Sequence, residues 1–281
     1  INIILDPILI FGYFGMPRMG IAGAAVATVI GQIIAAILAL VFNLKCNREL
    51  NISMKGFRPN GYLIVQIYKV GAPSIVVQAI GSLMTYGMNL ILAAFGSAQT
   101  VFGIYFKLQS FVFMPVFGLN NGMVPIIAYN YGAGHKDRVI KTIKHSVAYG
   151  VGIMFVGLLA MHIFPAQLMR MFDAEESLIA IGAPALETIS LSFVFAGFCI
   201  VAGSVFQALG NGVYSMIVSV ARQMCVLLPV AKLLSLSGEV TLIWWAFPIA
   251  ELASVLLTSY FLVRIYRKVI CHIGEPVVQD A

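Results

Sequence analysis

Apolar residues along the chain gather into long runs, separated by short polar or glycine-rich stretches. Most runs reach about 20 residues or more, the length that crosses a hydrocarbon core as a helix with its backbone hydrogen bonds made internally. The pattern predicts an all-α polytopic membrane protein, a helical bundle with seven complete spans and one partial span. The predicted spans are 1–14 (the partial one), 21–44, 63–95, 98–130, 142–165, 178–209, 213–236 and 240–266.

Composition supports lipid as the solvent of this chain. Hydrophobic residues make up 60% of the 281 positions and charged residues only 10%, whereas a soluble domain carries roughly a quarter charged residues. The four cysteines form no CxxC pair, and the four histidines lack metal-ligand spacing. No nucleotide-binding glycine pattern appears either. We therefore predict neither an enzyme nor a cofactor or metal site, and we expect the cysteines to be reduced packing residues.

The net charge of +6 comes from basic residues on alternate connections between the spans. These residues are Lys45, Arg48, Lys55, Arg58 and Lys69, then Lys136, Arg138, Lys141 and Lys144, and finally Arg264, Arg267 and Lys268. The positive-inside rule makes these connections cytoplasmic. The alternation predicts a multi-pass protein of the cell (inner) membrane with a cytoplasmic C-terminus, and no nucleic-acid partner.

A slight internal repeat suggests two lobes. The stretch NIILDPILIF and the apolar run after it lie over CVLLPVAKLL and its following run, so that Pro7 aligns with Pro229 and Gln32 with Glu251. Membrane transporters are often built from such repeats. The predicted division is two helices of a first lobe (1–44), a cytoplasmic inter-lobe linker (45–62), a six-helix second lobe (63–268) and a cytoplasmic tail (269–281).

The segment NIILDP, residues 2–7, carries candidate chemistry inside the first apolar run. Asn2 and Asp6 are four residues apart, so a helix places them on one face. Pro7 has no N–H, and this frees the carbonyl of Ile3 beside the carboxylate. An intramembrane carboxylate is readily protonated, and oxygen ligands of this kind also hold small cations such as Na⁺. The pattern predicts an ion or proton site and leaves the two ions open.

Three stretches resemble the multidrug and toxic compound extrusion (MATE) family of antiporters. They are NIILDPILIFGYFGMPRMGIAGAAVATVIGQ (2–32), MPVFGLNNGMVPIIAYNYGAGHKDR (114–138) and VFQALGNG (205–212). The resemblance places the first stretch on the family's fifth and sixth spans. It implies twelve spans in two six-helix lobes, with this chain holding the last two helices of the first lobe and all of the second.

The resemblance also implies further members of the ion site. In part of the family, the fifth-span Asn-x-x-x-Asp works with a threonine on the sixth span and an aspartate on the first. Matching through GIAGAAVATVIG puts the threonine on Thr28; the first-span aspartate has no counterpart here. The expected ion-coupling residues are thus Asp6, Asn2 and Thr28, with a helix bend at Pro7. A hydroxyl bonded back to its own helix is the alternative for Thr28.

Other polar residues inside the spans are candidates for a substrate cavity in the second lobe. They are Gln78, Asn89, Lys107, Gln109 and Glu187. Lys107 lies roughly 15 Å into its span at 1.5 Å per residue, and Glu187 lies at a similar depth. An ion pair between these two side chains is one hypothesis. The alternative is that Lys107 extends to the interface or bonds to backbone carbonyls.

These patterns predict a secondary active antiporter that exports organic, often cationic, drugs or metabolites in exchange for H⁺ or Na⁺. We expect a monomer whose partners are a small organic substrate and membrane lipid. Another branch of the family has coupling acids on its seventh and tenth spans, which this sequence lacks. Asp6 aligns with Leu228, so coupling is expected in the first lobe. The alternatives are a related lipid-linked saccharide flippase and a seven-helix receptor.

Overall fold

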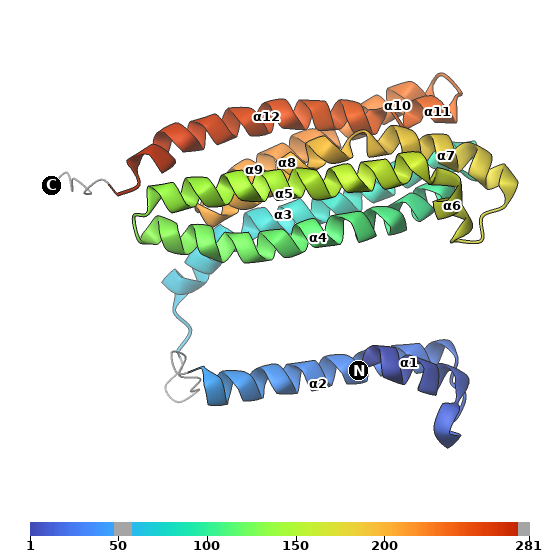
Figure 1. The fold of residues 1–281 in the computed structure, drawn as a ribbon, viewed down its shortest axis with the longest axis horizontal. Coiled ribbons are helices and arrows are strands. Elements are labelled where there is room, and N and C mark those ends of the chain that lie inside the picture. Colours follow the sequence, from blue (N-terminus) through green and yellow to red (C-terminus); the bar gives the residue numbers. More distant parts are fainter. Residues whose placement is uncertain (48–57, 275–281) are drawn as a thin grey trace. The chain divides into compact units, whose positions relative to one another are not determined.

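The structure, a computed structural model, describes residues 1–47 and 58–274, without the side chains of residues 69 and 70. Contacts divide the chain into two units, Ile1–Gly61 and Tyr62–Ala281, which are described separately. The described residues form helices and no strand (Figure 1). Within these residues, six helices are long and apolar enough to cross a membrane, and a seventh span is reached if a bent helix pair counts as one. The predicted all-α membrane fold is confirmed.

The first unit is a helix pair, α1 (Asn2–Phe11) and α2 (Ile21–Cys46). The turn between them folds back on α1, because the N–H of Met19 donates to the carbonyl of Leu9 over 3.0 Å. Gly23 of α2 lies against that same carbonyl, and a side chain at this position would overlap it. The missing side chain therefore permits the close approach of the two helices. The predicted linker that follows lies largely outside the described residues.

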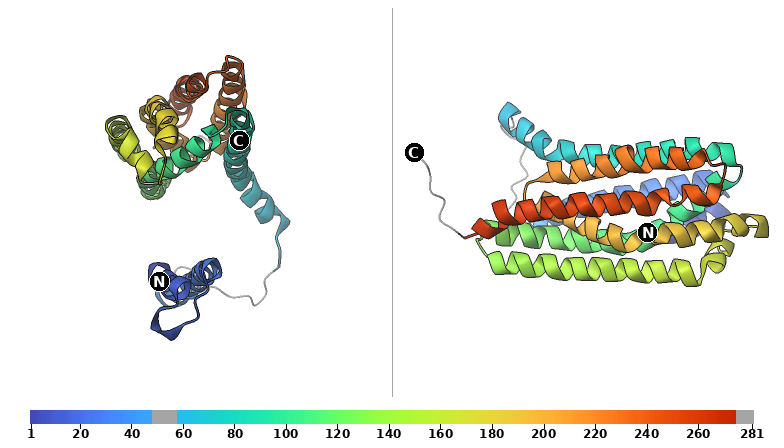
Figure 2. Two further views of the ribbon diagram at one scale, coloured as in Figure 1. Left: turned by 90° about the vertical axis from the view of Figure 1, so that its right-hand side faces the viewer. Right: turned by 90° about the horizontal axis from the view of Figure 1, so that it is seen from above.

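The second unit is a bundle of long helices and shorter segments joined end to end (Figures 1 and 2). Its elements are α3 (Gly61–Leu92), α4 (Ala98–Gly132), α5 (Lys136–Ile163), α6 (Pro165–Arg170), α7 (Glu176–Ser190), α8 (Phe193–Ala208), α9 (Gly212–Val220), the π-helical turn η3 (Ala221–Leu227), α10 (Leu228–Ser235), α11 (Val240–Ile243) and α12 (Ala246–Lys268). These elements cover the six predicted spans, and α5 begins six residues before its predicted start, at Lys136.

One predicted span, 178–209, is broken into α7 and α8, which meet at an angle of 48°. The break follows Ser190, while Pro184 lies inside the continuous α7. The hydroxyl of Ser190 donates to the carbonyl of Glu187 over 3.0 Å. The hydroxyl of Ser192 donates to the carbonyl of Ile189 over 2.7 Å. Serine side chains thus bond to carbonyls at the end of α7, and the carbonyl of Ile189 also accepts the backbone N–H of Ser192 over 3.0 Å. Such side-chain bonds to the backbone accompany helix bends that contain no proline.

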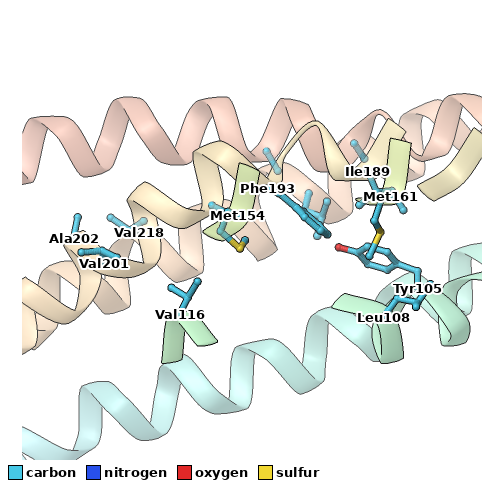
Figure 3. Packing of buried hydrophobic residues seen from close by; sticks show 14 of the residues in the cluster. Tyr105, Leu108, Val116, Met154, Met161, Ile189, Phe193, Val201, Ala202 and Val218 are labelled. Carbon is cyan, nitrogen blue, oxygen red and sulfur yellow. The ribbon is translucent and has the colours of Figure 1, made fainter. Parts of the chain in front are cut away.

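Buried apolar side chains from several helices form the core of the second unit. Figure 3 shows Tyr105 of α4 among them, together with Met154 of α5 and Phe193 of α8. The helices α5 and α8 approach closely at Gly150 and Gly197, where a Cβ on Gly197 would lie 3.0 Å from the carbonyl oxygen of Gly150. Small residues at helix crossings are the usual device for such contacts in membranes.

The first residues after α12 pack onto the connection between α4 and α5. The Nζ of Lys136 donates to the carbonyl of Cys271 over 2.8 Å, and Ile270 is buried. Two segments that were predicted to be cytoplasmic therefore lie at the same end of the bundle. The predicted tail is packed here at its start, and its residues 275–281 lie outside the described residues.

Candidate functional site

The second unit encloses a cavity of about 820 Å³ between its helices. Pockets for drug-sized ligands commonly have volumes of 300–1,000 Å³. The cavity draws its walls from α3, α4, α8, α9, η3 and α12. It lies within residues that the apolar pattern assigns to the membrane, so it is a polar space inside a membrane-spanning bundle.

The cavity wall combines side-chain amides with aromatic rings. The amides are Gln78, Gln109, Asn120, Asn121, Gln207 and Gln223. The rings are Tyr105, Phe106, Phe113, Phe117, Phe206 and Phe247. Arg222 and Glu251 are the charged residues among the described wall residues, and their charges cancel. A wall of this kind suits a flat, amphipathic organic molecule.

Arg222 and Glu251 form an ion pair on the cavity wall. The Nη1 of Arg222 donates to Oε2 of Glu251 over 3.0 Å, and their side chains are 28% and 6% exposed. The other ion pair among the described residues, Arg170–Glu176, is 59% and 80% exposed. A buried pair is costly to break, because the remaining charge is left without compensation. Arg222 and Glu251 are therefore held together by their surroundings.

Arg222 is carried by the π-helical turn η3, two turns before Pro229. Proline lacks the N–H that continues an α-helical ladder, and π turns are one way in which membrane helices adjust around this loss. Such turns occur frequently at functional sites. Here η3 contributes Arg222, Gln223 and Leu227 to the cavity wall.

Glu251 belongs to a polar stripe along α12. Glu251, Ser254 and Thr258 are spaced by three and four residues, so they share one helix face, and all three are buried. The Oε1 of Glu251 and the Oγ1 of Thr258 have no hydrogen-bond partner in the described part of the chain. The same holds for Oδ1 of Asn120 on α4. These three oxygens belong to residues of the cavity wall and lack a hydrogen-bond partner in the described part of the chain.

The predicted ion-site residues of the first unit lie on α1 and α2. Asp6 is half-buried, and its Oδ1 is buried with no hydrogen-bond partner among the described residues. Asn2 lies one turn earlier and is exposed. Thr28 is exposed, and its hydroxyl donates to the carbonyl of Ala24 over 2.9 Å. The structure thus gives Thr28 the back-bonded conformation, and no bond joins it to Asp6. Its ligand role stays a prediction.

Two of the five predicted cavity residues, Gln78 and Gln109, line the cavity. Asn89 does not, because its amide donates to the carbonyl of Thr85 on its own helix over 2.9 Å. Lys107 and Glu187 also lie outside the described wall.

The predicted ion pair between Lys107 and Glu187 is wrong: the described ion pairs include neither residue. The Nζ of Lys107 instead lies 5.6 Å from the centre of the Phe172 ring, a cation–π contact. The prediction was based on depth in the membrane, but the contact depends on the direction in which the side chain points around its helix. Tyr105 and Leu108 face the core, so Lys107 points away from it.

The ion pair Arg222–Glu251 is absent from the predicted site residues. A sequence signal for it exists, since Arg222 and Glu251 are charges of opposite sign well inside the last two predicted spans, whereas Lys232 and Arg264 lie near the span ends. Paired intramembrane charges are a standard indication of a functional site. The buried oxygens of Asn120 and Thr258 gave no comparable signal.

Comparison with known proteins identifies the family. The MatE family model matches residues 73–233, which span α3 to α10 and include most of the cavity wall. The chain belongs to the MATE family. The family assignment that the sequence resemblance implied is confirmed.

Curated relatives of this MATE-family chain include multidrug export proteins. The Multidrug export protein MepA of Staphylococcus aureus (strain N315) is 29% identical over 253 residues, which are 89% of this chain and 54% of MepA. The MepA of Staphylococcus haemolyticus (strain JCSC1435) is 28% identical over 269 residues, covering 95% and 58%. The chain thus spans about half the length of the curated relatives it matches.

Solved structures show the same fold. The MATE multidrug transporter DinF-BH has a TM-score of 0.80 and 33% identity, over 94% of this chain and 59% of that one. A MOP superfamily transporter from Pyrococcus furiosus has a TM-score of 0.84 and 21% identity, over 98% and 61%. The second likeness is a likeness of fold alone.

Proposed function

We propose that this chain is part of a secondary active antiporter that exports amphipathic organic compounds, often cationic, in exchange for H⁺ or Na⁺. The observation that carries the proposal is the cavity of about 820 Å³, polar and aromatic, inside a membrane-spanning bundle. Family membership supports transport, and the relative MepA is named a multidrug export protein. A small organic substrate is the expected partner.

Ion coupling is assigned to the first unit. Asp6 carries a buried carboxylate oxygen without a partner in the described residues, and no described ion pair involves it. Asn2 lies one turn away on the same helix, and Pro7 frees the carbonyl of Ile3. Such oxygens suit a proton or a small hard cation. Binding there would shift the bend at Pro7 and drive alternating access.

The orientation follows from the basic connections. Lys136 and Cys271 are bonded to each other, which supports a common, cytoplasmic side for the two segments that carry them. The protein would then work as a monomer in the cell membrane with its C-terminus inside. A saccharide flippase is less well supported, because the described cavity wall balances Arg222 against Glu251 and holds no excess of basic residues for a lipid-linked phosphate.

The test is efflux of a fluorescent organic cation by the full-length protein, under a proton gradient and under a Na⁺ gradient separately. Wild type and Asp6→Asn are compared, with Asp173→Asn as a matched control in the loop before α7. The proposal expects efflux under one gradient, and loss of that efflux in Asp6→Asn only. Efflux that persists in Asp6→Asn under both gradients removes Asp6 from the mechanism.

A further inference from the structure

Only one of the two carboxylate oxygens of Glu251 has a hydrogen-bond partner in the described part of the chain. Its Oε2 accepts the bond from Arg222, whereas Oε1 is buried without a partner in the described part of the chain. An ionised carboxylate has about four acceptor positions, and buried polar atoms are almost always bonded. Glu251 is 5% exposed and is one of the residues that line the cavity.

Two further orphan oxygens lie on the wall of the same cavity. These are Oδ1 of Asn120 and Oγ1 of Thr258. Thr258 lies about two turns from Glu251 on the same face of α12. All three atoms accept hydrogen bonds. A ligand that offers N–H groups would satisfy them, and a ligand of the same size and charge without N–H groups would leave them orphaned.

Charge does not favour a cation here, since Arg222 already balances Glu251. The pair also fixes the direction of the carboxylate, because a guanidinium donates its hydrogen bonds in a defined plane. Discrimination by this wall therefore rests on hydrogen-bond donors. The aromatic rings of the wall, such as Phe113 and Phe247, accept the flat part of a ligand with or without N–H groups.

We propose that Glu251 recognises N–H groups of the transported compound through Oε1, and that Arg222 is the positioning residue that holds the carboxylate. The substrate class is amphipathic amines, amidines or amides with free N–H, preferred over their fully alkylated counterparts. This inference rests on the proposed function, since it concerns the substrate of the same transporter.

The test uses two fluorescent probes with one skeleton and one charge. One is a rhodamine methyl ester with free amino groups, and the other is tetramethylrhodamine methyl ester, in which methyl groups replace the N–H atoms. Binding to the purified full-length protein is measured by fluorescence polarisation. Wild type should bind the amino probe about tenfold more tightly, as expected for a hydrogen bond to a charged acceptor.

The decisive variant is Arg222→Leu with Glu251→Leu. It leaves the net charge of the cavity unchanged, and apolar replacement of a buried pair is usually tolerated by the fold. Affinity for the amino probe should fall about tenfold, while affinity for the tetramethyl probe should stay within about twofold. The matched control is Arg170→Leu with Glu176→Leu, which removes the exposed ion pair and should change neither affinity.

A second variant, Glu251→Gln, keeps the shape of the side chain. Its readout is the ratio of the two affinities, because the unpaired Arg222 repels both cationic probes alike. The ratio should fall toward one. Equal affinities in wild type, or a ratio that survives both variants, overturns the assignment of Glu251. Wild type that exports neither probe from vesicles overturns the proposed function itself, whereas export with an unchanged ratio overturns only this inference.

Discussion

Among the described residues, each unit of this protein holds one carboxylate with a buried, unpartnered oxygen, but only one of the two has a counterion. In the first unit, Asp6 belongs to no ion pair of the described residues. In the second unit, Glu251 is bonded to Arg222. A buried acid without a counterion attracts a proton or a metal cation, whereas a compensated acid acts through hydrogen bonds. Under the functions proposed above, the first acid would serve ion coupling and the second substrate recognition.

The repeat sharpens this contrast. Asp6 comes directly before Pro7 on the first helix of its pair, and the aligned residue of the second unit is Leu228, directly before Pro229. Leu228 packs instead against Gly87 of α3, where a Cβ would lie 2.9 Å from its Cδ1. The second unit carries its acid on the other helix of the pair, at Glu251. The aligned helix pairs thus carry their acids at different positions.

Removing the acid of the first unit should have the largest effect. Asp6→Asn is expected to lower ion-driven efflux by about a hundredfold, because the amide neither takes up a proton nor balances a cation. Efflux by the full-length protein in vesicles is the measurement. Asp6→Glu, which keeps the charge, should retain part of the activity. An equal loss in both variants would mean that packing, and not charge, is what Asp6 supplies.

Breaking the ion pair of the second unit should affect stability. Arg222→Leu is expected to destabilise the protein by about 3 kcal/mol, because Glu251 is left buried and uncompensated. The double change with Glu251→Leu should recover most of this loss. Thermal unfolding of the full-length protein in detergent gives the comparison. Arg170→Leu, at the exposed pair, should leave the unfolding temperature unchanged; a comparable drop there contradicts the argument from burial.

The two aligned prolines should differ in their effect on coupling. Pro7→Ala restores an N–H that can bond the carbonyl of Ile3, so this oxygen is lost as a ligand. We expect the apparent affinity for the coupling ion to fall by about tenfold, the equivalent of one lost oxygen contact. Pro229→Ala lies beside Leu228, which has no ion to bind, and should leave this affinity unchanged. Equal effects from both prolines would point to helix bending alone.

The smallest expected effect belongs to Thr28. Its hydroxyl donates to the carbonyl of Ala24, yet its lone pairs stay available as a ligand. Thr28→Val keeps the shape and removes the oxygen, and should weaken coupling-ion affinity by about threefold. Thr28→Ser is the control and should match wild type. If Thr28→Val also matches wild type, Thr28 is not a ligand of the coupling ion, and its hydroxyl only bonds back to the carbonyl of Ala24.

Much of the fold was predictable from the sequence, because helix formation in lipid depends on local composition. An apolar run of sufficient length must form a helix, since no water satisfies its backbone. The runs at 98–130 and 240–266 accordingly match α4 and α12 within a few residues. The break after Ser190 was not predicted, since two serine hydroxyls bond to backbone carbonyls there and the proline of α7, Pro184, lies inside the continuous helix.

The sequence by itself determined the spans, the basic connections and the acid of NIILDP, since each depends on neighbouring residues. Only the tertiary structure decided which polar residues meet. Arg222 and Glu251 lie 29 residues apart on different helices, and Lys107 contacts the ring of Phe172 instead of the carboxylate predicted at similar depth, that of Glu187. Depth in a membrane follows from counting residues, but the direction of a side chain around its helix depends on how the helices pack.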